Sequence, residues 1–174
     1  MTLYYDFNEA NQSVTLGVVA SNPPFGYIGL GFGRDDMFGT DMVIATVNGN
    51  QVTLDDYWST KHGKPALDST IEGCKSSYYL LDSSVNSTHL VYTFGRSMKP
   101  EDNCDFPLTP NASMQVGFAW KNVSNISFHS SNYGQVRVNF TQSYKGYALP
   151  PKGSNGPRKL IHIACLLIII TPLS

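Results

Sequence analysis

Residues 26–48 read GYIGLGFGRDDMFGTDMVIATVN, and this stretch decides the fold. It begins with an apolar run interrupted by glycines, passes through an acidic turn that holds Met37, and ends in a β-branched run that starts at Asp41. Glycine inside a strand permits the close approach of another backbone or of a ligand. The stretch therefore predicts two buried strands around a turn. The Met37 thioether in that turn either exposes apolar surface to no benefit or serves as a ligand for a chemically soft group.

Short strands are expected along most of the chain, because β-branched and aromatic runs alternate with Gly- and Pro-containing turns. The expected strands are 13–20, 26–33, 41–47, 51–58, 78–81, 89–95, 114–120 and 135–140, and residues 1–10 also have the pattern of a strand and a turn. Asn48-Gly49-Asn50 lies between two of these runs and is a strong hairpin signal. A helical turn is considered only in the polar loop 100–105. The pattern predicts an all-β antiparallel sandwich or barrel.

Composition limits the classes of function. The chain has 174 residues, which is enough for one domain with a good core. Its net charge is −1 and no basic stripe is present, so nucleic acid is not an expected partner. Hydrolytic catalysis has little support, because there is no Gly-X-Ser-X-Gly elbow and Asp55 and Asp56 point to opposite faces of a strand. No catalytic residue is assigned.

Two acidic residues, Asp35 and Asp36, lie in the turn around Met37, with Asp41 nearby. Such a group can hold a hard cation such as calcium, but the loop has no regular ligand spacing. Solvated turn acids are the simpler interpretation. The four histidines have no close pair of the kind that zinc requires.

Several features indicate a secreted, extracellular protein. Six Asn-X-Ser/Thr glycosylation sequons occur, at Asn11, Asn86, Asn111, Asn122, Asn125 and Asn139. Cys74 and Cys104 lie in polar, turn-like stretches and are predicted to form a disulfide, the alternative being two free thiols in a cytosolic protein. On the chain-entropy description this disulfide stabilises the domain by roughly 3–4 kcal/mol. No signal peptide is visible, so we expect the true start to lie upstream.

The carboxyl end has a different composition from the rest. Residues 1–149 are expected to form the domain, and 150–159 (PPKGSNGPRK) to form a linker. Residues 160–174 (LIHIACLLIIITPLS) are largely apolar but shorter than the roughly 20 residues of a spanning helix. The small residues before them resemble a GPI-attachment signal. The tail is therefore interpreted as a GPI signal that anchors the protein to the membrane, with a shortened transmembrane helix or a core strand as alternatives.

Met37 and His129 form the most interesting pair of candidate ligands. Each lies in a loop beside an expected buried strand, and loops of a sandwich cluster at its two ends, where they can face one another. A thioether and an imidazole on opposite sides of a flat pocket make a haem iron site suited to electron transfer. Phe32, Phe38 and Phe128, together with Tyr133, are candidates to pack against a porphyrin because they are adjacent in sequence.

The segment GYIGLGFGRDDMFGTDMVIATVNGNQVTLDDYWSTKHGKPALD is similar to the core of DOMON domains, and LVYTFGRSMKPEDNCDFPL resembles a later part of the same family. The resemblance covers roughly residues 3–142. It implies a β-sandwich of immunoglobulin-like architecture. In haem-binding members, a methionine after the Gly-rich strand and a histidine before the last long strand hold haem b. Those positions match Met37 and His129, whereas Met42 falls within the following strand.

The resemblance therefore implies an extracellular electron-transfer domain that binds haem b, with a redox partner protein or a small-molecule donor or acceptor. Such a domain is an electron carrier more than a complete enzyme. Two alternatives stay open. One is a haem-free module that binds carbohydrate or protein, with Tyr57, Trp58 and Trp120 as stacking aromatics. The other is the regulatory domain of a truncated monooxygenase or reductase.

Overall fold

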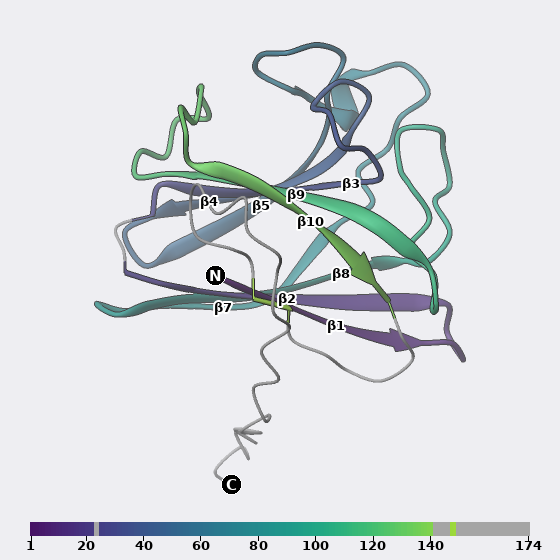
Figure 1. Cartoon of the computed structure of the whole chain (residues 1–174), viewed down its shortest axis with the longest axis horizontal. Coiled ribbons are helices and arrows are strands. Elements are labelled where there is room, and N and C mark those ends of the chain that lie inside the picture. Colours follow the sequence, from purple (N-terminus) through teal and green to yellow (C-terminus); the bar gives the residue numbers. More distant parts are fainter. Residues whose placement is uncertain (23–24, 141–146, 149–174) are drawn as a thin grey trace, which may run out of the picture.

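The computed structural model describes residues 1–22, 25–140 and 147–148, and these residues form two antiparallel β-sheets packed face to face (Figure 1). The predicted all-β sandwich is confirmed. The strands are β1 (Thr2–Asn8), β2 (Ser13–Ser21), β3 (Tyr27–Phe32), β4 (Asp41–Asn48), β5 (Gln51–Trp58), β6 (Ala66–Leu67), β7 (Tyr79–Val85), β8 (His89–Ser97), β9 (Ser113–Lys121), β10 (Tyr133–Asn139) and β11 (Tyr147–Ala148). A single 3₁₀ turn, η1 (Asp68–Thr70), is present among the described residues.

One sheet has the strand order β11-β1-β2-β8-β7, and the other has the order β10-β9-β3-β4-β5-β6. We call the second the six-stranded sheet. Alternate residues of each strand face the space between the sheets because side chains alternate across a strand. In β10, for example, Val136 and Val138 are buried while Gln135 and Arg137 are exposed. The core consists mainly of aliphatic and aromatic side chains from both sheets.

The eight strands predicted from sequence are all present, with ends shifted by a few residues. The Asn-Gly hairpin is also present, since Asn48 pairs with Gln51 and Gly49 has a φ of 59°. The left-handed conformation at Gly49 explains why glycine suits this turn. The helical turn considered in the loop 100–105 does not form, and residues 101–105 are bends. The course of this loop is fixed instead by the disulfide at Cys104 and by polar contacts of Asp102.

The predicted linker 150–159 and the apolar tail 160–174, with His162, lie outside the described residues. Within the described part of the chain, no helix has the length and apolarity needed to cross a membrane.

Candidate functional site

The outer face of the six-stranded sheet carries a patch of very small residues. Ile28, Leu30 and Phe32 of β3 lie in the core, so Gly29 and Gly31 face outward. In the neighbouring strand β9, Gly117 lies opposite Gly31, and Ala119 lies opposite Gly29. Four small residues on two paired strands are thus neighbours on this face. We call them the small-residue patch: Gly29, Gly31, Gly117 and Ala119.

The patch has open space above part of it. A Cβ atom placed on Gly117 would meet no heavy atom closer than 3.9 Å. A Cβ on Gly29 would lie 3.5 Å from the Ile44 side chain, which is ordinary contact. At Gly31 it would lie 2.8 Å from Thr40, whose side chain covers that corner. A flat ligand therefore has access to the sheet backbone at the Gly117 side of the patch.

An apolar cluster borders the patch on the side of β4 and β5. Tyr27, Ile44 and Tyr57 are buried together, and Met42 and Ile126 pack against them. These side chains belong to the outer face, because the residues between them in β3 and β4 point into the core. Ile126 comes from the β9–β10 loop, so this loop folds over the outer face.

Met37 lies in the loop 33–40 that follows β3, and its side chain is half-buried. Four hydrogen bonds hold the loop. Gly33 N donates to Gln115 O, and Gly39 N donates to Ser59 O. Ser59 N donates back to Thr40 O, and the Thr40 hydroxyl donates to Asp36 O. Thr40 brings the end of the loop over Gly31. The neighbouring Phe38 is 56% exposed, which makes it one of the large apolar side chains that the fold leaves uncovered.

His129 lies in the β9–β10 loop, which is also held by polar contacts. Lys121 Nζ donates to Ser127 Oγ and to Phe128 O, each at 3.1 Å, and the Tyr27 hydroxyl donates to Ser127 O at 2.6 Å. The His129 ring packs between Phe128 and Tyr133, with ring centroids 5.5 and 5.0 Å apart.

The surroundings of His129 favour a neutral imidazole that has a lone pair on one ring nitrogen. Burial lowers the pKa of His129, the bond to Ser130 opposes this effect, and the charge of Lys121 adds to it. The Nδ1 atom lies 3.3 Å from Ser130 O. A backbone carbonyl accepts a hydrogen bond, so the tautomer that suits this contact carries its proton on Nδ1 and leaves the lone pair on Nε2.

The structure does not bring the two predicted ligands to one end of the sandwich. Strands β3 and β9 are antiparallel, with Phe32 opposite Val116 and Tyr27 opposite Lys121. The loop of Met37 therefore leaves one end of β3 and the loop of His129 leaves the other, as Figure 1 shows. At about 3.3 Å per residue, the six residues of β3 put roughly 20 Å between the points where the two loops leave the sheet. Both loops then turn back over the outer face, where Thr40 covers Gly31 and Ile126 packs beside Tyr27. The small-residue patch lies between them.

The remaining predicted residues have different environments. Phe32 is fully buried in the core and cannot contact a ligand on the outer face. Phe128 and Tyr133 are 77% and 59% exposed, beside His129. Tyr57 is buried, Trp58 stacks on Phe106, and Trp120 packs against the core, so none of these three is an open platform for sugar.

The predicted disulfide is confirmed, and the other residues singled out in the sequence differ in exposure. Cys74 and Cys104 form the predicted disulfide, with Cα atoms 5.7 Å apart. The sequon asparagines are all exposed: Asn11, Asn86, Asn111, Asn122, Asn125 and Asn139. Of the acidic turn residues, Asp35 and Asp36 are exposed, and Asp36 lies 3.5 Å from His62. Asp41 does not join them, because it faces the interior.

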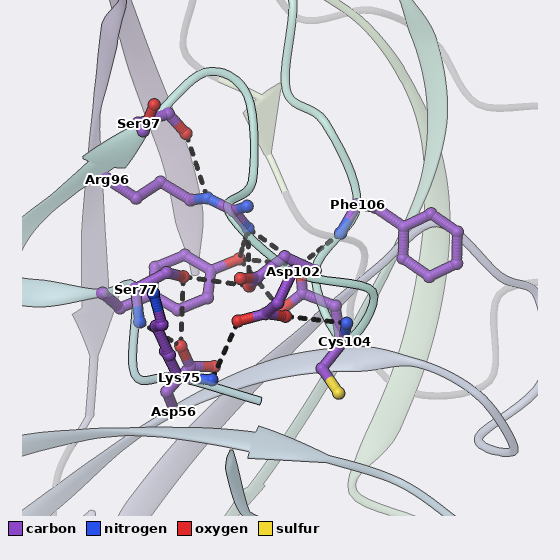
Figure 2. A network of polar contacts seen from close by, with 11 residues as sticks. Asp56, Lys75, Ser77, Arg96, Ser97, Asp102, Cys104 and Phe106 are labelled. Carbon is purple, nitrogen blue, oxygen red and sulfur yellow. Dashed lines mark hydrogen bonds and ion pairs between the residues drawn. The ribbon is translucent and has the colours of Figure 1, made fainter. Parts of the chain in front are cut away.

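A polar cluster with no counterpart among the sequence predictions is buried between the two sheets. It contains Asp41, Asp56, Asp68, Asp105, Tyr78 and Arg96, all of which are at most 7% exposed. We call this group the interior polar cluster, and Figure 2 shows part of it. Arg96 Nη1 donates to Asp41 Oδ2 at 2.8 Å and to the Tyr78 hydroxyl at 2.7 Å, and it lies 3.3 Å from Asp105 Oδ1.

The cluster ties the two sheets together. Asp41 and Asp56 belong to β4 and β5, whereas Arg96 belongs to β8 of the other sheet. Asp41 also accepts from the backbone N–H of Phe106, and Asp56 accepts from the N–H of Ser77. Burial raises the pKa of these carboxyls, to about 7 for Asp41, although Arg96 opposes the rise, and to about 6 for Asp56.

One signal in the sequence points to this cluster. Arg96 ends the apolar run HLVYTFG, and Asp41 precedes the apolar run MVIATV. At both positions the two-residue alternation predicts an inward side chain. A charge at an inward position implies a buried partner, because an unpaired ion is costly to bury. The pattern does not identify the partner, since 54 residues lie between Asp41 and Arg96.

The comparisons with known proteins agree with this architecture. A cytochrome domain of cellobiose dehydrogenase from Myriococcum thermophilum is similar in fold, with a TM-score of 0.60 and 15% identity, and the match covers 80% of this chain and 74% of that one. The cytochrome b domain of pyranose dehydrogenase from Coprinopsis cinerea gives a TM-score of 0.54 at 15% identity, with 84% and 74% covered. No curated protein matches the sequence significantly.

At such identity the two solved structures show a common fold and nothing further. The sequence profile of the DOMON domain matches residues 1–121, which is more than half of the chain and contains β1 to β9. That match includes both stretches that carry the sequence resemblance, and the sandwich agrees with it. The chain therefore belongs to the DOMON domain family.

Proposed function

We propose that the protein is an electron-transfer domain that binds haem b on the outer face of the six-stranded sheet, with Met37 and His129 as axial ligands. The observation that carries the proposal is the small-residue patch between the two ligand loops. A flat group can stand on glycine backbone there, with one loop on each side of it. Haem with Met/His ligation has a raised potential and transfers single electrons.

The donor set supports this proposal. A thioether and a neutral imidazole are both soft or borderline ligands that suit haem iron. His129 has its Nδ1 beside a backbone carbonyl and a lowered pKa, which keeps Nε2 available as a lone pair near neutral pH. Lys121 and Tyr27 hold the loop of His129 in place. The exposed Phe38, Phe128 and Tyr133 offer apolar surface on both sides of the patch.

A surface cavity of about 290 Å³ lies beyond the patch at the start of β9. Gly33, Gln115 and Arg137 line it, and neither proposed ligand does. We therefore base the haem proposal on the patch and the ligand loops, and not on this cavity.

The absorption spectrum tests the proposal. The chain, produced with haem supplied, is expected to show a Soret band with the signature of six-coordinate low-spin haem. Met37→Leu is expected to shift the spectrum to a five-coordinate form, and His129→Ala to abolish most haem retention. Matched controls are His89→Ala, an exposed histidine of β8, and Met114→Leu on β9, both of which should keep the parent spectrum.

Met42 is the rival thioether, because it lies on the outer face opposite Gly31. If Met42→Leu changes the spectrum and Met37→Leu does not, the ligand assignment is wrong although haem is bound. Absence of any Soret band in the parent protein contradicts the function itself.

We also propose that the protein acts outside the cell, anchored by its C-terminal tail, and exchanges electrons with a redox partner there. The disulfide and the six exposed sequons support an extracellular location. Mass spectrometry of tryptic peptides from protein made in a eukaryotic host should find N-glycans at the sequons. Unmodified asparagine at all six contradicts the location.

A further inference from the structure

Two loops lie side by side at one end of the sandwich, the loop that follows β3 and the loop that follows β5 (Figure 1). The backbone N–H of Gly39 donates to Ser59 O at 2.7 Å. Farther along the same loops, the His62 ring lies 3.5 Å from Asp36 Oδ1. We call the surface that they share the two-loop surface, and it consists of residues 33–40 and 59–65.

An exposed aromatic side chain lies on this surface, next to the proposed thioether ligand. Phe38 is 56% exposed and directly follows Met37 in the sequence. Aromatic side chains are enriched at protein–protein interfaces, because they offer a large apolar contact area. A protein that covers Phe38 would therefore lie beside Met37.

The two-loop surface carries more basic than acidic residues. Arg34, Lys61 and Lys64 are exposed, and none of them forms an ion pair with a described residue. Asp35 and Asp36 are the acidic residues of this surface, and Asp36 already contacts a histidine of the other loop. The three cationic groups are therefore available to the carboxylates of a partner.

The strands beside the two-loop surface add to this positive charge. Lys121 and Arg137 belong to the outer face of the six-stranded sheet, where Asp55 is the only acidic residue of the described strands. Together with the two-loop surface, this side of the molecule therefore carries five basic residues and three acidic ones.

The opposite side of the molecule has the reverse charge. The four long strands of the other sheet, β1, β2, β7 and β8, contain Arg96 as their one lysine or arginine, and Arg96 is buried. Asp6 of β1 and Asp82 of β7 are exposed there. The described charges thus form a dipole whose positive end lies on the side of the two proposed ligands. Such a field orients an approaching anionic protein toward that side.

The glycosylation sequons distinguish the two ends of the positive side. Asn122 and Asn125 are sequons in the β9–β10 loop, and a glycan on either would cover that end. The two-loop surface contains none, since no sequon occurs in residues 12–85. Asn139 ends β10, and the Asn111 N–H donates to the residue after it, so both lie at the sheet edge opposite β5 and β6. The two-loop surface is therefore the open approach to the ligands.

We propose that the redox partner docks on the two-loop surface, and that this partner is a protein whose surface carries carboxylates around its own redox centre. The proposal rests on the haem function, because it names the partner of that site. Arg34, Lys61 and Lys64 pair with the partner's carboxylates, and Phe38 supplies apolar contact beside Met37. Charges at the rim of an interface act mainly on the association rate, which falls as salt screens them.

Stopped-flow kinetics of the haem-loaded chain test the proposal. The reduced chain is mixed with plastocyanin, an acidic copper protein, and one electron passes from the chain to Cu(II) to give Cu(I). The second-order rate constant is expected to fall about tenfold between ionic strengths of about 10 mM and about 300 mM. With the tricationic oxidant tris(phenanthroline)cobalt(III), the rate constant should not fall over the same range.

A charge-reversal variant locates the surface. Lys61→Glu combined with Lys64→Glu should slow the reaction with plastocyanin about tenfold at low ionic strength, because two attractive charges become repulsive. The reaction with the cobalt complex should not slow, whereas a distorted haem site would slow both reactions. Lys75→Glu combined with Lys99→Glu is the matched control, because both lysines are exposed and lie outside the two-loop surface. It should slow the reaction with plastocyanin by no more than about threefold.

Amide chemical shifts of the ¹⁵N-labelled chain, titrated with Cu(I) plastocyanin, give a second measurement that needs no haem. Shifts are expected in residues 33–40 and 59–65. If they appear but the chain shows no Soret band, the haem function fails and the two-loop surface stands as a docking site. If haem is bound, three results overturn the proposal: shifts that spare the two loops, a plastocyanin rate constant independent of ionic strength, or a Lys61/Lys64 variant that reacts like its control.

Discussion

Asp41 and Met42 are neighbours in β4, yet they face two sites of opposite character. Asp41 points inward to Arg96 and Tyr78 in the interior polar cluster. Met42 points outward, opposite Gly31, beside the small-residue patch. The inner site is closed, charged and crossed by hydrogen bonds, whereas the outer site is partly open and consists largely of backbone.

The difference shows two ways in which a sandwich makes a site. The interior polar cluster depends on side chains from both sheets, so its geometry exists only when the sheets have packed. The small-residue patch depends on the absence of side chains on two paired strands, so it exists as soon as β3 and β9 pair. Substitutions at the two sites should therefore affect different properties: stability for the inner site and ligand binding for the outer one.

The largest expected effect is on the inner site. Arg96→Met removes the only guanidinium that the described residues offer to the buried carboxylates, and should lower the free energy of unfolding by about 3–5 kcal/mol. Urea unfolding of the purified chain measures this loss. Arg137→Met, on the exposed face of β10, is the matched control and should change stability by no more than about 0.5 kcal/mol.

A second substitution sharpens this prediction. In an Arg96→Met background, Asp41→Asn removes the charge that Arg96 neutralised, so part of the lost stability should return. A double variant that is as unstable as the sum of its single variants would show that the Arg96–Asp41 pair contributes through packing and not through charge.

The next effect is a pH dependence that originates in the inner site. Burial raises the pKa of Asp41 to about 7, of Asp56 to about 6 and of Asp68 to about 8, from a usual value of 3.8. Between the unfolded pKa of 3.8 and the raised folded values, the highest of which is about 8, the folded chain binds more protons than the unfolded chain. The free energy of unfolding therefore falls as pH rises through this range. Each proton retained only in the folded state contributes about 1.4 kcal/mol per pH unit.

Urea unfolding at a series of pH values measures this slope. Asp68→Asn should reduce it, whereas Asp55→Asn should leave it unchanged. A stability that rises from mildly acidic to neutral pH would have the wrong sign and would mean that the cluster is fully ionised when folded.

The comparison of the two sites also explains what sequence could predict. The strands, the Asn-Gly hairpin and the Cys74–Cys104 pair follow from local patterns, because two-residue alternation and turn chemistry involve neighbours in sequence. The glycines of 26–33 indicate, from sequence alone, a place where a ligand or another backbone can approach. Gly117 was not connected with them, because the pairing of β3 with β9 brings together residues 86 positions apart.

The limits of sequence were different for Met37 and for Asp41. Met37 was singled out because a thioether in a polar turn conflicts with its surroundings, but its position relative to His129 depends on strand direction. Since β3 and β9 are antiparallel, the loops lie at opposite ends of β3 and not at one shared end. The sequence places Asp41 beside Asp35 and Asp36, because proximity along the chain does not show that the first residue of β4 points inward.

The smallest expected effect on stability, and the sharpest separation of the two sites, comes from Gly117→Leu. The added side chain has room, since its Cβ would meet nothing closer than 3.9 Å, so the free energy of unfolding should stay within about 1 kcal/mol of the parent. The leucine would cover the patch where a flat ligand meets the sheet, so haem retention should fall at least tenfold. Soret absorbance after gel filtration measures that loss.

Gly17→Leu is the matched control, because Gly17 lies in β2 of the other sheet with its nearest contacts at 3.5 and 3.6 Å. It makes the same chemical change far from the patch and should retain haem like the parent. If both variants retain haem equally, the ligand does not rest on the small-residue patch. If both lose it equally, the loss follows from the bulk added to a strand. Only loss confined to Gly117→Leu means that the missing side chains of β3 and β9 form the binding surface.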